Sequence, residues 1–220
     1  MRELLLSNGF LIVTVIAVLE AIMAVMLWKM YTAERREDVL CLACLCTGLV
    51  YDAAIIALGA VIPAGIAVPI SKLRYIFSGL LIPLLVPIGV YGLKLKGLKV
   101  KIAWITAVLL MIPGVIGGVM EKLELLTFAG VTRYISTGGA PGWVSAVNRM
   151  TTVGTVFFLI VIGIILLVKK RGGYVLAAGL LMLFFSVIGP ASGNTDLIFM
   201  LSMFGELFMV FFLMLHMKRE

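Results

Sequence analysis

Charged side chains are scarce in this chain. They make up 13% of its 220 residues, whereas hydrophobic residues make up 63%, and the mean hydropathy is +1.20. A soluble domain of this size has too little interior to bury so much apolar surface. The composition therefore excludes an ordinary soluble protein and indicates a polytopic membrane protein. The apolar runs use most of the chain, so we expect residues 1–220 to form a single transmembrane helical domain.

Histidine is nearly absent, and the few cysteines lie together. His216 is the one histidine, and Cys41, Cys44 and Cys46 fall within one apolar run. A metal site needs further ligands, so we expect small thiols packed at a helix interface and no metal or cofactor. The HExxH and GxSxG motifs of metal-dependent and serine hydrolases are also missing from the sequence. Whether the protein is an enzyme stays open.

Long hydrophobic runs are what the chain has in abundance. A helix needs roughly 20 apolar residues to cross the hydrocarbon core of a bilayer. The first run has no small-residue cleavage site, so we expect a retained helix. The fold class predicted is all-α, a bundle of seven transmembrane helices in an integral, multi-pass protein of the cell membrane, at about 9–31, 39–60, 74–93, 100–120, 149–168, 173–190 and 195–216.

The basic residues are distributed unevenly between the two ends of these helices. A net charge of +7 fits nucleic acid as well as a membrane, but the distribution favours the membrane. The positive-inside rule places the N-terminus outside and the C-terminus in the cytoplasm. Only six basic residues fall on the predicted outer side: Arg2, Lys72, Arg74, Lys122, Arg133 and Arg149. The other twelve fall on the predicted cytoplasmic side: Lys29, Arg35, Arg36, Lys94, Lys96, Lys99, Lys101, Lys169, Lys170, Arg171, Lys218 and Arg219.

Two glutamates interrupt the first and last apolar runs. Glu20 and Glu206 each lie 11 residues into their runs, roughly 16 Å deep at the rise of an α-helix. A charge at that depth costs on the order of 3 kcal/mol, so these side chains are expected to face other helices. Small residues beside them, including Ser202, support this. If the first and last helices are neighbours, the two carboxyls form a proton or cation site; alternatively, each hydrogen-bonds a neighbouring helix and has only a structural role.

Three further ionisable residues lie toward the predicted outer half. Asp52 lies in the second run, and Arg74 and Arg149 open the third and fifth. We expect Asp52 to pair with Arg74, with Arg149 as the alternative partner. The candidate substrate- or ion-binding residues are Glu20, Asp52, Arg74, Arg149, Ser202 and Glu206.

The longest connector spans residues 121–148 on the predicted outer side. Its alternating segments VTRYIST and WVSAV flank GGAPG, which predicts a β-hairpin, and LELLTF predicts a short interfacial helix. Such a segment is either a lid over the outer mouth or an ordered connector.

The third run begins RYIFSGLLIPLL, Arg74 to Leu85. It resembles the third helix of microbial rhodopsins, in which an Arg-Tyr pair is followed by Pro-Leu-Leu nine residues after the arginine. Seven spans, an outside N-terminus and a longer connector between spans 2 and 3 are also similar to that family. The resemblance covers roughly 30 residues and implies a seven-helix bundle in which Arg74 matches the arginine of the proton path.

The same comparison shows departures from the rhodopsin pattern. Retinal needs a lysine in the last helix, and the last run has none before Lys218; Leu207 occupies the aligned position. What the resemblance implies is therefore a bundle without retinal. The family's counterion carboxylates and its pocket tryptophan on span 3 are replaced by Phe77, Met203 and Ser78.

Three functional classes fit these features. A proton- or cation-coupled small-solute transporter or channel uses the midplane carboxylates. A receptor, sensor or membrane interaction subunit needs only the bundle. For an intramembrane enzyme acting on lipid or peptide, the only candidate acid or base groups are Glu20, Asp52 and Glu206. The partners expected are the lipid bilayer and a proton, cation or small solute, with no nucleic acid.

Overall fold

The computed structural model describes residues 8–59, 62–191 and 193–219. Arg2, counted above among the outer basic residues, lies outside them. The described residues form seven long helical segments, one of them interrupted, and one pair of strands. In chain order these are α2 (Gly9–Glu34), α3 (Glu37–Leu58), α4 (Ala64–Leu81), η1 (Ile82–Leu84), α5 (Leu85–Gly92), α6 (Leu98–Met120), β1 (Lys122–Phe128), β2 (Val131–Gly138), α7 (Gly142–Val168), α8 (Tyr174–Ala191) and α9 (Thr195–Arg219).

The helices have the length and composition of membrane spans. Within the described residues, six are long and apolar enough to cross a bilayer, counting α4, η1 and α5 as one, and α8 is apolar but shorter. Large apolar side chains such as Val15, Val18 and Ile22 on α2 are exposed at the surface of the bundle. An apolar surface of this extent is stable only in contact with lipid. The chain is a multi-pass membrane protein.

Two helices begin earlier than the sequence predicts. The third segment starts at Ala64 instead of Arg74, and α7 starts at Gly142 instead of Arg149. The expectation places each boundary at a charged residue, but the apolar stretches before Arg74 and Arg149 continue the helix. Pro69 is the sixth residue of α4 and removes one backbone hydrogen bond from the helix, which nevertheless continues to Leu81. The expected long connector between spans 2 and 3 is therefore mostly helical.

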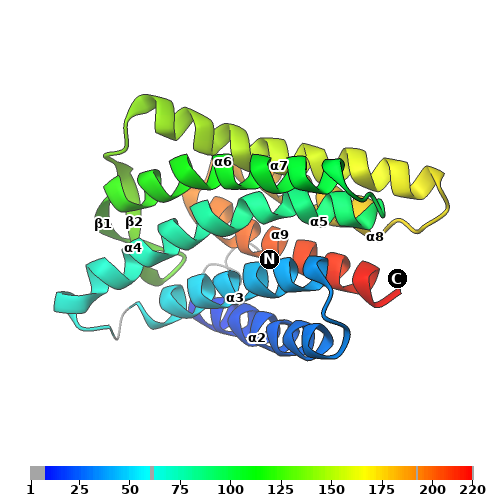
Figure 1. Ribbon diagram of the computed structural model, residues 1–220. Coiled ribbons are helices and arrows are strands. Elements are labelled where there is room, and N and C mark those ends of the chain that lie inside the picture. The colour runs from blue at the N-terminus through cyan, green and yellow to red at the C-terminus, as the bar shows by residue number, and fades with distance from the viewer. Residues whose placement is uncertain (1–7, 60–61, 192, 220) are drawn as a thin grey trace.

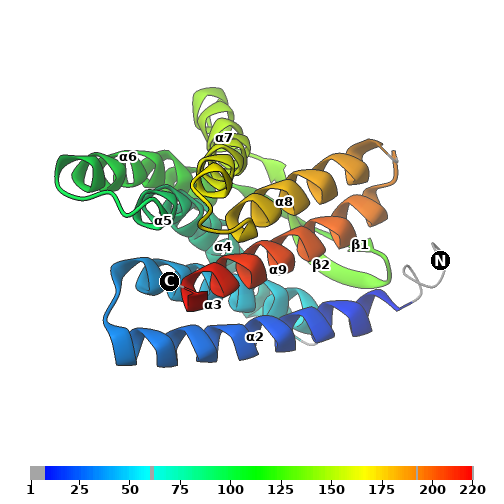
Figure 2. The same ribbon diagram turned by 90° about the vertical axis from the view of Figure 1, so that its right-hand side faces the viewer.

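The helices close into a ring (Figures 1 and 2). Each helix packs against its neighbour in the sequence, and α2 packs against α9, as the sequence predicts for the first and last spans. A close backbone approach joins α4 and α6, where a Cβ added to Gly79 would lie 2.4 Å from the backbone of Gly114. Glycine allows this contact, which is a common way for membrane helices to pack. At Pro83 the helix tightens into η1 before continuing as α5.

A β-hairpin lies at one end of the bundle, which we call the hairpin end (Figure 1). Its strands pair antiparallel from Lys122–Gly138 to Phe128–Val131. Ala129 and Gly130, both with positive φ, form the two-residue turn, as type I′ hairpin turns require. The predicted interfacial helix LELLTF is wrong because these residues form β1. WVSAV, predicted to be a strand, instead lies at the start of α7. The glycine-rich segment GGAPG connects β2 to α7, whereas the hairpin turn is at Ala129 and Gly130.

The hairpin is fastened to three helices. The Ala129 N–H donates to Asp196 Oδ1 of α9 at 2.9 Å, and the Ser136 N–H donates to the Tyr75 hydroxyl of α4 at 2.8 Å. A Cβ on Gly9 of α2 would lie 2.0 Å from the Ala129 carbonyl oxygen. Ala129 and Val131 are buried in the core of the bundle. The hairpin therefore packs into the bundle and is not a loose connector.

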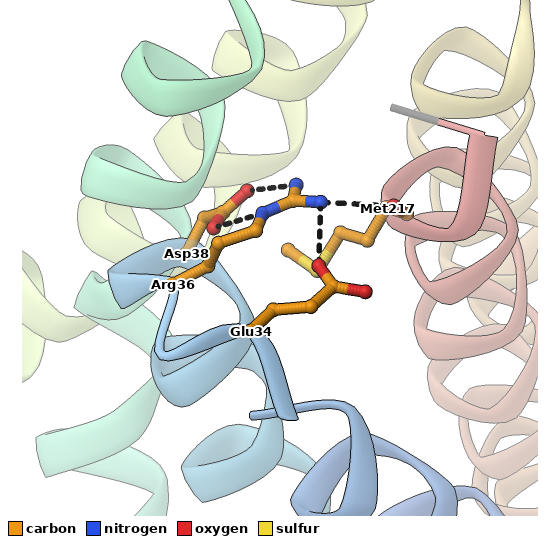
Figure 3. A network of polar contacts seen from close by, with 4 residues as sticks. All are labelled: Glu34, Arg36, Asp38 and Met217. Atoms are coloured by element: carbon orange, nitrogen blue, oxygen red, sulfur yellow. Dashed lines mark hydrogen bonds and ion pairs between the residues drawn. The ribbon is translucent and has the colours of Figure 1, made fainter. Parts of the chain in front are cut away.

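The opposite end, which we call the basic end, carries residues 35–36, 93–97 and 169–173 and the end of α9. There Arg36 donates to both carboxylate oxygens of Asp38, at 3.2 and 2.7 Å, and to Glu34 and the Met217 carbonyl oxygen, each at 3.2 Å (Figure 3). The hydrogen bond with Asp38 raises the pKa of Arg36 above its ordinary value. This network ties the ends of α2, α3 and α9 together.

Candidate functional site

An ion pair links α3 and α4 inside the bundle. Arg74 Nε donates to Asp52 Oδ1 at 2.7 Å, and Arg74 Nη1 lies 3.4 Å from the Tyr134 carbonyl oxygen of β2. Arg74 is only 6% exposed. The structure thus forms the Asp52–Arg74 pair that the sequence predicts. Arg149 is exposed on α7, and no ion pair within the described residues involves it.

Asp52 shares a cavity with Glu206. The cavity has a volume of about 100 Å³, and α3, α4, α7, α8 and α9 all contribute to its wall. The hydroxyl residues Ser78, Thr152 and Thr155 also line it, among mostly apolar side chains. Since one water occupies about 30 Å³ in the liquid, the space suits roughly three waters or a partly hydrated small ion.

A second cavity lies beside the first, toward the hairpin end. It has a volume of about 190 Å³ and lies between α4, α6 and α7. Ser78, Ile82 and Thr152 line both cavities, so the two share a wall. The polar residues of the second cavity include Tyr75, Ser78, Glu121, Asn148, Thr151 and Thr152. The two adjacent cavities therefore have Glu206 at one end and Glu121 at the other. The Glu121 carboxylate accepts a hydrogen bond from the Ser136 hydroxyl of the hairpin.

Glu20 lies deep in the bundle but outside these two cavities. It is 1% exposed, and its Oε2 has no hydrogen-bond partner among the described residues. The Cys46 thiol donates to the Glu20 backbone carbonyl at 3.4 Å. Glu20 lines neither cavity, and in the described part of the chain no hydrogen bond joins it to Glu206.

Ser202 faces a different space. Its hydroxyl donates to the Phe199 carbonyl oxygen at 2.8 Å. With Tyr75, Arg133 and Ser136 it lines a cavity of about 310 Å³ between α9, α4 and the hairpin. The structure therefore places Asp52 and Glu206 in one cavity and pairs Asp52 with Arg74, which does not line that cavity. Ser202, Arg149 and Glu20 also lie outside the cavity.

Arg133 is the residue near this site that sequence reasoning missed. Its guanidinium carbon lies 3.7 Å from the centre of the Phe199 ring and 5.6 Å from that of Phe128. Its Nε is buried without a hydrogen-bond partner in the described residues. Burial lowers the pKa of Arg133 to about 10, and the charge of Arg74 acts in the same direction, so the side chain stays cationic at neutral pH. The sequence places Arg133 on a predicted strand, but nothing in it shows that this strand packs against α9 beside Phe199.

No family model matches the chain, and no curated protein matches it. The three cysteines are free, and among the described residues no group of three or more His, Cys, Asp or Glu side chains is placed to hold a metal ion. The family therefore stays unidentified. What the structure shows is a helical membrane protein with a buried cluster of ionisable side chains.

Proposed function

We propose that the chain is a proton- or cation-coupled small-solute transporter or channel, with Asp52 and Glu206 as the binding carboxylates. The observation that supports this most strongly is the cavity that both side chains line within the membrane-spanning bundle. Ionisable groups inside a bilayer are costly, and they are typical of ion and proton pathways. Arg74, paired with Asp52, holds that carboxylate in place.

The lining of the two adjacent cavities favours a cation over an anion. Among the described residues it includes three acids, Asp52, Glu206 and Glu121, and no Lys, Arg or His. Hydroxyl groups of Ser78 and Thr152 stand where the two spaces meet. A proton, or a small cation that keeps some of its water, fits both the sign of the charge and the volumes. The two cavities from Glu121 to Glu206 would be its route from the hairpin end.

Glu20 has a supporting role in this proposal. A buried carboxyl with an unpartnered oxygen avoids the cost of a buried charge by keeping its proton. Glu20 would then respond to the charge on Glu206 without touching the transported ion. The pairing of Glu20 with Glu206 is thus proposed as an electrostatic coupling.

We also propose that the hairpin end faces the outside of the cell. The support is the charge asymmetry of the sequence, which places most lysines and arginines at the basic end. We also propose that the resemblance to microbial rhodopsins extends to the role of Arg74, which lies beside the proposed path. Leu207 occupies the position of the retinal-binding lysine, so no retinal is expected. In intact cells, a cysteine added beyond Lys218 in a background without the native cysteines should resist an impermeant thiol reagent.

Flux through proteoliposomes tests the proposed function. With a pH-sensitive dye inside and an imposed proton or sodium gradient, the unaltered protein should show uptake above empty vesicles. Glu206→Gln and Asp52→Asn should each lower the rate at least about tenfold, since they remove a charge from the cavity without changing its shape. Glu124→Gln is the matched control, because Glu124 is exposed on β1. Full flux in Glu206→Gln would overturn the assignment of the site.

A further inference from the structure

A groove of about 560 Å³ lies along α5, α6 and α7. It opens on the outward face of the bundle, where Ile102 and Met150 are exposed. Its volume lies within the range of roughly 300–1,000 Å³ that is usual for small-molecule sites. Apolar side chains make up most of its lining, among them Val86, Val90, Ile102, Leu110, Met150 and Phe158.

Two of the hydroxyl groups that line the groove, those of Thr151 and Thr155, already donate to backbone carbonyls. Thr151 donates to the Val147 carbonyl oxygen at 2.9 Å, and Thr155 donates to the Thr152 carbonyl oxygen at 3.0 Å. Bonds back to the helix remove the need for a polar partner in the groove. Gly154 leaves room between them, since a Cβ added there would meet nothing within 4 Å. The groove therefore suits an apolar occupant.

A single charge stands at one end of the groove. Lys99 lines it at the basic end, is exposed, and takes part in no ion pair within the described residues. Lys96 and Lys101 are exposed nearby on the same connector and helix start. The positive charge at this end favours a ligand whose polar group is an anion.

Along α6, the lining of the groove runs from Lys99 to Leu110. Leu110 lies 11 residues beyond Lys99 along α6, about 16 Å at the rise of an α-helix. Half of the roughly 30 Å hydrocarbon core is about 15 Å. A chain anchored at Lys99 would therefore reach the bilayer midplane near Leu110.

We propose that this groove is a binding site for an anionic phospholipid, with one acyl chain along α5, α6 and α7 and the phosphate at Lys99. An apolar groove with a single cation at its membrane-surface end is complementary to such a lipid in shape and charge. The groove opens on the lipid-facing side of the bundle, and Thr151 and Thr155 at its base also line the two inner cavities. The lipid site does not depend on the proposed transport.

Native mass spectrometry of protein released from nanodiscs tests this site. The probes are phosphatidylglycerol and phosphatidylcholine with the same acyl chains. The unaltered protein should retain phosphatidylglycerol several-fold more than phosphatidylcholine. Lys99→Gln should lower that retention about fivefold, the factor expected for one lysine near an anionic surface, and Lys99→Arg should preserve it. Gly154→Leu should displace both lipids, because the new side chain fills the groove without a clash.

Two control variants separate the groove from a general attraction to the basic end. Lys96→Gln removes the same charge outside the groove lining and should have little effect. Gly142→Leu adds the same bulk in open space at the start of α7 and should leave retention unchanged. Equal retention of the two lipids, equal loss in Lys96→Gln and Lys99→Gln, or full retention in Gly154→Leu would each overturn the proposal.

Discussion

The arginines at the two ends of the bundle differ in how many hydrogen bonds their guanidinium groups donate. At the basic end, Arg36 is 27% exposed by side chain and donates to two carboxylates and a backbone carbonyl. Toward the hairpin end, the more deeply buried Arg74 has one close acceptor, Asp52, and Arg133 contacts mainly aromatic rings. The hydrogen bonds of Arg36 hold the ends of α2, α3 and α9 together. Arginines with spare donors beside a cavity are sensitive to the charge state of the carboxylates around them.

Separating Asp52 from Arg74 should have the largest effect on stability. Arg74→Gln leaves a partly buried carboxylate without its cation, which typically costs about 3–5 kcal/mol. Thermal or denaturant unfolding in detergent measures the loss. Arg149→Gln, a change at an exposed residue, is the control and should stay within about 0.5 kcal/mol of the unaltered protein. Equal stability of the two variants would contradict a stabilising role for the pair.

Breaking the Arg36 network should cost less. Arg36→Gln removes charge-assisted bonds that are partly screened by solvent, so we expect a loss of about 1–2 kcal/mol in the free energy of unfolding. Hydrogen exchange should rise at the ends of α2, α3 and α9, where Glu34, Asp38 and Met217 lie. Protection that falls evenly over the whole bundle would show that Arg36 is not a local fastening.

Replacing Arg133 should have the smallest effect on stability. Arg133→Met loses cation–π contacts worth about 1 kcal/mol. It also removes the cost of burying a guanidinium whose Nε has no hydrogen-bond partner in the described residues. The free energy of unfolding should therefore change by less than about 1 kcal/mol. Proton or cation flux should change more than stability, since a positive charge near Asp52 and Glu206 is lost. A loss as large as that of Arg74→Gln would mean that the two arginines have equivalent roles.

The sequence predicts much of the helical architecture and one contact of the site. Hydrophobic runs locate the spans because a bilayer demands long apolar helices, and the cost of a buried charge predicts that Asp52 finds Arg74. The first residue of a helix is less predictable. The helices that contain Arg74 and Arg149 begin several residues before these arginines, because the preceding residues are mostly apolar and continue the helix. Local alternation located strand β2 but not its partner, because both strands depend on pairing with each other and on packing against Tyr75 and Asp196.

The distribution of the acids depends on tertiary packing that the sequence does not reveal. Equal depth on neighbouring helices suggests that Glu20 and Glu206 meet. Depth fixes the height of a side chain but not its direction around the helix. In the folded chain Glu206 lines the cavity with Asp52, and Glu20 is enclosed separately. Arg133 enters the neighbourhood through the hairpin, which no span-based reasoning includes.

Infrared difference spectroscopy between low and high pH tests most directly whether Glu206 exchanges a proton in the cavity. We expect a protonated carboxyl band that loses intensity as pH rises, disappears in Glu206→Gln and shifts in Asp52→Asn. Glu124→Gln, on the exposed strand, should leave the band unchanged. A band that is unaffected by Glu206→Gln would contradict the central claim that Glu206 and Asp52 form a proton or cation site.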